Sequence, residues 1–169
     1  LSHTSAHHVL KFYNSETGKL IGTVESIYQP VSFFGGGMTE KPEVSFGAKD
    51  KLFAATSIGG VSAQSGTKTV LVWQMTTGKI LSRIVANKKI TSIEICRNND
   101  ILAISTVDGN ISFWDIKNGK KLYSYKAHDS SVLAIDLSSN GKLLATGSAD
   151  NTVKIWEVEL DKIAKNINT

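Results

Sequence analysis

The sequence predicts an all-β fold built from repeated four-stranded antiparallel units, and three observations support this prediction. Trp73, Trp114 and Trp156 are spaced by 41 and 42 residues, a period typical of a repeat of four short strands. A short apolar run precedes each tryptophan. A turn containing Gly-Lys follows the first two, at residues 77–79 and 118–120.

The repeats begin before the first tryptophan. Residues 17–21 carry a further Gly-Lys turn, which places Tyr13 in the tryptophan position. We therefore expect an incomplete unit of two strands at residues 8–25. The later units are expected at residues 43–85, 89–126 and 128–158, the last without its fourth strand. This amounts to thirteen strands, or about three and a quarter units.

Local patterns support the individual strands of the later units. Residues 132–137 alternate with the two-residue period of a strand. Further strands are expected near residues 142–147 and 152–158, and the last strand of the preceding unit near residues 121–125. Val, Ile, Thr, Phe and Trp dominate these runs, as pleated surfaces favour. Tight turns separate them, at Asn140-Gly141, Asp108-Gly109-Asn110 and Asn118-Gly119.

The tail at residues 159–169 has two interpretations. Its apolar residues follow a helical spacing, which predicts a short amphipathic helix. These residues are Leu160, Ile163, Ala164 and Ile167. The alternative is that the tail continues into the fourth strand of the last unit. We favour the helix.

Two dipeptides add to the repeat pattern: Trp114-Asp115 closes one repeat, and Ala127-His128 opens the next. With the spacing, they make the chain resemble the WD40 family of β-propellers over most of residues 8–158. The resemblance implies four-stranded blades in a ring. Because propellers close with typically four to eight blades, we expect the chain to form part of a larger, seven-bladed ring. Further sequence, a second copy or a different protein would supply the other blades.

The resemblance also implies a buried chain of hydrogen bonds in the last repeat, a structural tetrad. Its members are His128, Thr146, Asp150 and Trp156. The indole N–H of Trp156 would donate to Thr146, and Thr146 would connect to His128. His128 would in turn bind Asp150. A satisfied polar chain of this kind holds strands and loops in a rigid geometry, so we interpret it as structural.

The earlier repeats depart from this pattern. In the middle repeat the aligned positions are Asn87, Ile104, Asp108 and Trp114. In the first full repeat Trp73 is present, but Ala55 takes the hydroxyl position. Neither Ile104 nor Ala55 has a hydrogen-bonding side chain. These two repeats are therefore expected to rely on packing.

The first full repeat contains extra residues, because Tyr13 and Trp73 are 60 residues apart. Insertions at residues 29–38 and 58–67 account for the excess, and the resemblance implies that both emerge on the top face. Loops on a rigid scaffold commonly carry binding residues. The predicted partner-binding residues are Phe33, Phe34, Met38, Val61 and Gln64. Alternatively, the two phenylalanines fold back over the blade edge or the central channel, and the second loop is merely flexible.

No residue pattern predicts catalysis. His3, His7 and His8 lack a fourth ligand at a spacing known for zinc sites. The run Gly35-Gly36-Gly37 lacks the lysine and the strand-to-helix context of a phosphate-binding loop. The sequence offers no set of nucleophile, base and orienting group. We therefore expect no enzymatic activity, no metal and no cofactor.

Charge and composition narrow the classes of partner. The formal net charge of +4 comes from scattered lysines, and Arg83 and Arg97 are the only arginines. Nucleic-acid recognition favours arginine forks and a basic stripe, so this class is disfavoured. No apolar run is long enough to span a membrane. The single cysteine, Cys96, is expected to be buried and inert, in agreement with a cytoplasmic location, and a nuclear one is compatible too.

These observations favour a non-catalytic scaffold or adaptor. It would bind a protein partner, either a peptide segment or another subunit, through top-face loops at residues 29–42 and 58–68. One alternative is a recognition or regulatory module of a larger enzyme or switch protein. The other is an architectural subunit of a large multiprotein assembly.

Overall fold

The computed structural model describes residues 9–25, 43–47, 51–56, 68–96 and 100–159. Within these ranges every regular secondary-structure element is a β-strand, and no helix occurs. The predicted all-β fold with antiparallel four-stranded units is confirmed. The predicted tail helix lies outside the described residues, as do the partner-binding candidates Phe33, Phe34, Met38, Val61 and Gln64.

The described ranges contain thirteen strands in four antiparallel sheets. The first sheet pairs β1 (Val9–Tyr13) with β2 (Leu20–Glu25). Sheet A consists of β3 (Val44–Gly47), β4 (Leu52–Thr56), β5 (Thr69–Gln74) and β6 (Lys79–Val85). Sheet B consists of β7 (Ile90–Ile95), β8 (Ile101–Thr106), β9 (Asn110–Asp115) and β10 (Lys121–Lys126). Sheet C consists of β11 (Val132–Leu137), β12 (Leu143–Ser148) and β13 (Val153–Glu157).

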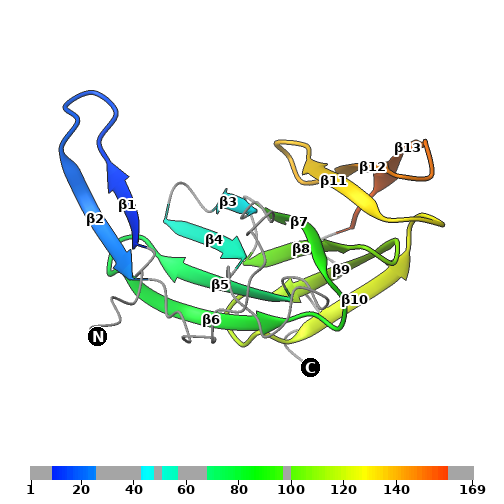
Figure 1. The fold of residues 1–169 in the computed structure, drawn as a ribbon, viewed down its shortest axis with the longest axis horizontal. Coiled ribbons are helices and arrows are strands. Elements are labelled where there is room, and N and C mark those ends of the chain that lie inside the picture. Colours follow the sequence, from blue (N-terminus) through cyan, green and yellow to red (C-terminus); the bar gives the residue numbers. More distant parts are fainter. Residues whose placement is uncertain (1–8, 26–42, 48–50, 57–67, 97–99, 160–169) are drawn as a thin grey trace, which may run out of the picture.

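Every strand pairs with its neighbour in sequence, and the sheets follow one another in chain order from β1–β2 to sheet C (Figure 1). We call the face of a sheet that points toward the next sheet its forward face, and the opposite face its rear face. All residues of β4 and β8 are buried. Strands that are buried along their whole length in this way are typical of sheets covered on both faces.

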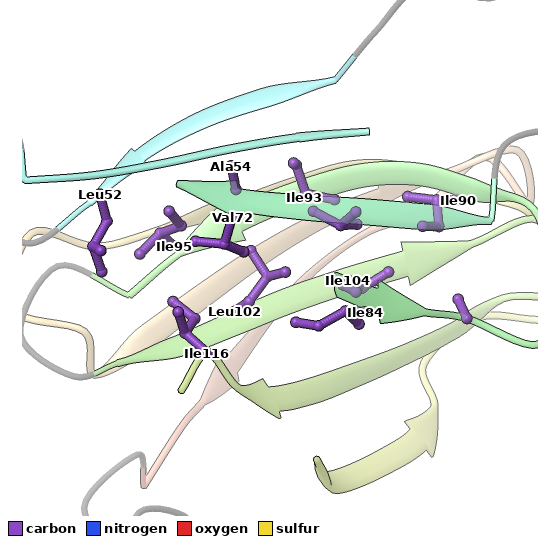
Figure 2. Close-up of a cluster of buried hydrophobic side chains, with 12 residues drawn as sticks. Leu52, Ala54, Val72, Ile84, Ile90, Ile93, Ile95, Leu102, Ile104 and Ile116 are labelled. Carbon is purple, nitrogen blue, oxygen red and sulfur yellow. The ribbon is translucent and has the colours of Figure 1, made fainter. Parts of the chain in front are cut away.

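The forward face of sheet A packs on the rear face of sheet B. One buried cluster joins the two faces, and Figure 2 shows most of its members. From sheet A it contains Leu52, Ala54, Val70 and Val72, and from sheet B Ile93, Ile95, Leu102 and Ile104. Burying one large aliphatic side chain contributes roughly 1.5 to 3 kcal/mol. The contact between sheets therefore stabilises the fold far more than any single hydrogen bond.

The forward face of sheet B packs on the rear face of sheet C in the same way. Its buried residues Cys96, Ile101, Ala103, Ile111 and Phe113 cluster with Ile135 and Leu144 of sheet C. Cys96 is buried, as predicted, and burial raises the pKa of its thiol to about 12. The thiol therefore stays protonated at neutral pH, which makes it a poor nucleophile.

Close backbone contact sets the spacing between sheets A and B. A Cβ atom at Gly47 would lie 2.0 Å from Cγ2 of Ile95 and 2.7 Å from its Cβ. Beside this contact, the N–H of Ile95 donates to Oγ of Ser45 at 2.9 Å, and that hydroxyl donates to Oε2 of Glu94 at 3.1 Å. Strands β3 and β7 can approach this closely because residue 47 has no side chain.

Gly47→Ala is expected to destabilise the protein by about 1 to 3 kcal/mol, the usual effect of overpacking a core. Gly147→Ala is the matched control, because a Cβ there meets no atom within 4 Å. Chemical denaturation of both variants and the wild type measures the difference. Equal stability of Gly47→Ala and Gly147→Ala would contradict the close contact between β3 and β7.

Candidate functional site

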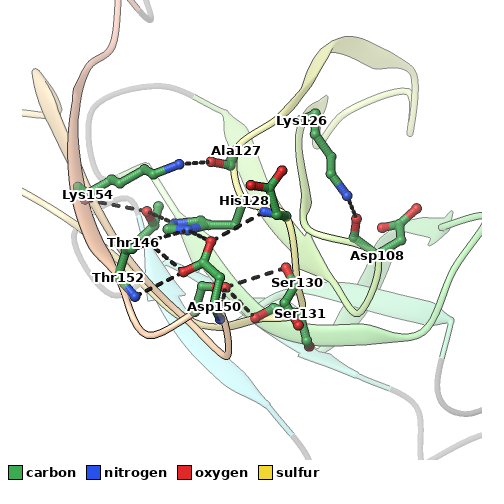
Figure 3. Close-up of polar contacts among 12 residues, drawn as sticks. Asp108, Lys126, Ala127, His128, Ser130, Ser131, Thr146, Asp150, Thr152 and Lys154 are labelled. Carbon is green, nitrogen blue, oxygen red and sulfur yellow. Dashed lines mark hydrogen bonds and ion pairs between the residues drawn. The ribbon is translucent and has the colours of Figure 1, made fainter.

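The four residues of the predicted tetrad lie together at one edge of sheet C. Figure 3 shows three of them, His128, Thr146 and Asp150. The indole N–H of Trp156 donates to Oγ1 of Thr146 at 3.0 Å. Oγ1 of Thr146 lies 2.7 Å from Nε2 of His128. On the other side of the ring, Nδ1 of His128 lies 2.8 Å from Oδ2 of Asp150. A single chain of hydrogen bonds thus links β13, β12, the β10–β11 connection and the β12–β13 turn.

The partners of Asp150 determine the direction of this chain. Oδ1 of Asp150 accepts from the hydroxyl of Thr152 at 2.6 Å and from its backbone N–H at 2.9 Å. These bonds and the His128 contact hold the pKa of Asp150 well below its usual range. An ionised Asp150 only accepts, so Nδ1 of His128 donates to it. Nε2 of a neutral ring is then the acceptor for the Thr146 hydroxyl.

Further bonds tie the adjoining loops together (Figure 3). Oγ of Ser148 and N–H of Ala149 both donate to the carbonyl of Ser131 at 2.9 Å. Nζ of Lys154 donates to the carbonyl of Ala127 at 2.8 Å. The loop segments of sheets B and C therefore hold a fixed geometry. We call this the loop edge, defined by residues 87–89, 107–109, 127–131 and 149–152.

Gly109 extends the loop edge from sheet C to sheet B. Its carbonyl accepts from N–H of Ala127 at 2.9 Å and from N–H of His128 at 3.1 Å. Its φ is +81°, and a Cβ there would lie 2.1 Å from the carbonyl oxygen of His128. A residue with a side chain fits neither this backbone conformation nor this space. The turn before β9 and the connection before β11 therefore form one unit.

Sheets A and B lack the tetrad, but sheet B has a polar contact that the sequence comparison missed. The indole N–H of Trp114 donates to Oγ of Ser112 at 2.8 Å. Ser112 on β9 pairs directly with Ile104 on β8. The hydroxyl therefore lies on β9, whereas the aligned position of the tetrad lies on β8. Sheet B therefore lacks the tetrad, as expected, but Trp114 is held by a hydrogen bond in addition to packing.

Sheet A has no such hydroxyl. The equivalent cross-strand pair is Ala55 and Leu71, and both side chains are apolar. Among the described residues, Nε1 of Trp73 has no hydrogen-bond partner. Phe53 packs beside the Trp73 ring instead, at 5.6 Å between ring centroids. In sheet A the tryptophan is therefore held by packing, as expected.

The order Thr146, His128, Asp150 has the form of a nucleophile, a base and an orienting acid. However, Thr146 and His128 are each only 1% exposed, and the Thr146 oxygen already accepts from Trp156. A substrate has no access to this hydroxyl, so the arrangement serves to position loops. In the described part of the chain no group of three or more His, Cys, Asp or Glu side chains could hold a metal ion.

Stacked antiparallel sheets with a loop edge held by a Trp–Thr–His–Asp chain define a repeat protein of the β-propeller class. Residues 78–115 and 119–157 each match the family model of the WD domain, G-beta repeat. Two WD40 repeats therefore lie within this chain. Comparison with curated proteins gives no significant match.

Two solved structures with a similar fold are computationally designed proteins. The Ika4 protein is 23% identical, with a TM-score of 0.60 over 89% of this chain and 79% of that chain. The Ika8 protein is 24% identical, with a TM-score of 0.59 over 89% of this chain and 40% of that chain. At these identities the similarity shows the fold alone.

Family and fold together support a protein-interaction scaffold in general, and WD40 repeat domains are typically non-catalytic. None of the described residues forms a helix with the length and apolarity needed to cross a membrane.

Thr146→Val is expected to destabilise the protein by about 2 to 4 kcal/mol, because it removes the partner of both Trp156 and His128. Each buried polar group left unpaired costs roughly 1 to 3 kcal/mol. Ser112→Ala is the matched comparison and should have about half the effect, since it leaves only Trp114 without its acceptor. Urea denaturation measures both. Equal effects would show that the longer hydrogen-bond chain adds nothing.

Acid is expected to weaken the loop edge through Asp150. A carboxylate whose pKa is lowered in the folded state stabilises the fold above its unfolded pKa of about 3.9. That contribution is lost as pH falls through the folded-state value. The Tm difference between wild type and Asp150→Asn should therefore shrink between about pH 5 and pH 2. Scanning calorimetry tests this, and a constant difference would contradict it.

Proposed function

We propose that this chain is a non-catalytic WD40 scaffold or adaptor that binds a protein segment at its loop edge. The loops at residues 29–42 and 58–68 would be the main contact region. The observation that carries the proposal is the hydrogen-bonded loop edge of sheets B and C, which offers a rigid surface. Binding to a rigid surface loses little conformational entropy.

The exposed side chains of this edge suit recognition of a protein segment. Among the described residues they supply amides, a carboxylate, an ammonium group, a hydroxyl and two apolar contacts. They are Asn87, Lys88, Val107, Asp129, Ala149, Asn151 and Thr152. Such a mixed set can bond a peptide backbone and its side chains, whereas a basic stripe for phosphates is lacking among them.

The residues that flank the two long loops support their role. The N–H of Glu43 donates to Oγ1 of Thr56 at 2.9 Å, and the N–H of Thr56 donates to the Glu43 carbonyl at 2.9 Å. The start of β3 and the end of β4 therefore meet at one end of sheet A. Both loops adjoin this end, which corresponds to the loop edge of sheets B and C. A partner held there could contact several blades at once.

The double variant Phe33→Ala/Phe34→Ala is expected to weaken partner binding by about 2 kcal/mol, roughly 30-fold in Kd, as loss of an interface hot spot does. The partner is first captured with the wild-type chain from an extract of its source and identified by mass spectrometry. Its Kd for each variant is then measured by calorimetry.

Tyr123→Ala is the control, because Tyr123 is exposed on the outer strand of sheet B, away from the loop edge. Unchanged binding by the phenylalanine variant would reject the loop site. It would instead support an architectural subunit with broad contacts.

A further inference from the structure

Sheets A and B carry matching turns at the edge opposite the loop edge, which we call the turn edge. Because neighbouring strands are antiparallel, the β5–β6 and β9–β10 turns lie there, together with the start of β4. In each turn the N–H of a glycine, Gly78 or Gly119, donates to the carbonyl of the last residue of the preceding strand, at 2.8 and 2.9 Å. A lysine follows each glycine. The repeat therefore places Lys79 and Lys120 at equivalent points of the turn edge.

A contact between the two sheets brings further cations to the same place. A Cβ atom at Gly119 would lie 3.4 Å from the carbonyl oxygen of Arg83 and 3.8 Å from Cγ1 of Ile84. The β9–β10 turn of sheet B therefore rests on β6 of sheet A. Lys120 and Lys121 follow this turn, and they and Arg83 are exposed.

Lys51 extends the group across the end of sheet A. The N–H of Met75 donates to the carbonyl of Lys51 at 2.8 Å, and the neighbouring residue Gln74 pairs with Lys79. Both lysines are exposed. We call the five cations of the two sheets the turn patch. They are Lys51, Lys79, Arg83, Lys120 and Lys121.

Nearby carboxylates leave the turn patch positively charged. Asp100 pairs with Lys117 instead, at 2.7 Å, and Asp115 is only 1% exposed. Among the described residues, none of the five cations forms an ion pair. Sheet C does not extend the patch, because Glu157 lies beside Lys142 at its end of the turn edge. The fold thus gathers lysines that are scattered in the sequence, and the resulting potential attracts anionic partners.

Exposed apolar side chains lie among these cations. Ile80 is 38% exposed and Leu81 is 39% exposed, and both lie on β6 between Lys79 and Arg83. We propose that the turn patch binds an acidic protein segment in which Asp and Glu residues are interspersed with apolar ones. The carboxylates pair with the cations, and the apolar side chains of the segment cover Ile80 and Leu81.

The composition of the patch favours a protein segment over a nucleic acid. Four of its five cations are lysines, which lack the planar fork that guanidinium groups present to phosphates and bases. The aromatic ring beside the patch, Trp114, is half-buried, and Nζ of Lys121 lies over it at 5.9 Å from the ring centroid. That ring is therefore not a free platform on which bases could stack.

The turns also lack the side chains that insert into a lipid surface. Their exposed residues include Thr76, Thr77 and Asn118, which are polar, whereas interfacial membrane binding buries Trp, Phe or Leu. An acidic protein segment therefore fits the patch better than a membrane does. If the proposed loop-edge binding also holds, the chain keeps two partners roughly 20 Å apart, the length of one strand.

A short fluorescent peptide in which Asp and Glu alternate with Leu tests the proposal by fluorescence anisotropy. Its Kd for the wild-type chain is expected to be about 10 to 100 μM at low salt. Raising the ionic strength from about 0.02 to about 0.3 M is expected to weaken binding at least about fivefold, because salt screens exposed charges. The same peptide with Asn and Gln in place of its acidic residues should not bind. No binding of the acidic peptide up to about 1 mM would overturn the proposal.

Charge reversals locate the binding surface. Lys120→Glu is expected to raise the Kd about tenfold, and Arg83→Glu/Lys120→Glu to raise it further. Lys11→Glu is the matched control, since it makes the same change of charge at an exposed residue of β1, outside the turn patch. Thermal unfolding confirms that each variant is folded. If Lys11→Glu weakened binding as much as Lys120→Glu, net charge alone would explain the binding and the patch would be rejected.

Two other anionic probes distinguish the class of partner. These are a single-stranded thymidine oligonucleotide and vesicles of phosphatidylcholine with phosphatidylserine. Tighter binding of either than of the acidic peptide would overturn the proposal in favour of a phosphate-bearing partner. The Phe33→Ala/Phe34→Ala variant is expected to bind the acidic peptide like the wild type. Failure at the turn patch is therefore distinguishable from failure of the proposed loop-edge binding.

Discussion

The stacking of one sheet on the next is the interaction on which the rest of this structure depends. Strand pairing within sheet A or B alone would leave the aliphatic side chains on both faces of the sheet exposed to water, which is unfavourable. These side chains are buried only when a neighbouring sheet covers each face. Stability is therefore a sum over neighbouring interfaces, as in other repeat architectures, and each blade requires the next.

Polar groups play a narrower role, concentrated at the loop edge. The Trp156 to Asp150 chain is fully paired from end to end, which is the condition under which a buried polar network rigidifies a fold. The same tryptophan position is served by a serine in sheet B and by packing in sheet A. The polar network that holds the loops rigid is therefore most extensive at sheet C, although all three sheets keep the same strand geometry.

Much of the fold and part of the site follow from the sequence, and the reasons are specific. Strand alternation and the tryptophan spacing are local signals, so they predict the strand order, and the resemblance to WD40 repeats implies the four residues that meet at His128. The Ser112 contact escaped prediction because a comparison by aligned columns looks for the hydroxyl on β8, whereas it lies across the sheet on β9. The contact of Gly47 with Ile95 depends on how two sheets approach, which no spacing encodes.

The position of Cys96 allows its reactivity to serve as a probe of motion between sheets B and C. This thiol is buried between sheets B and C, and its pKa of about 12 leaves almost no thiolate at neutral pH. A thiol reagent can therefore react only during moments when the two sheets separate. The labelling rate then measures how often that interface opens, and the single cysteine of the sequence makes the signal unambiguous.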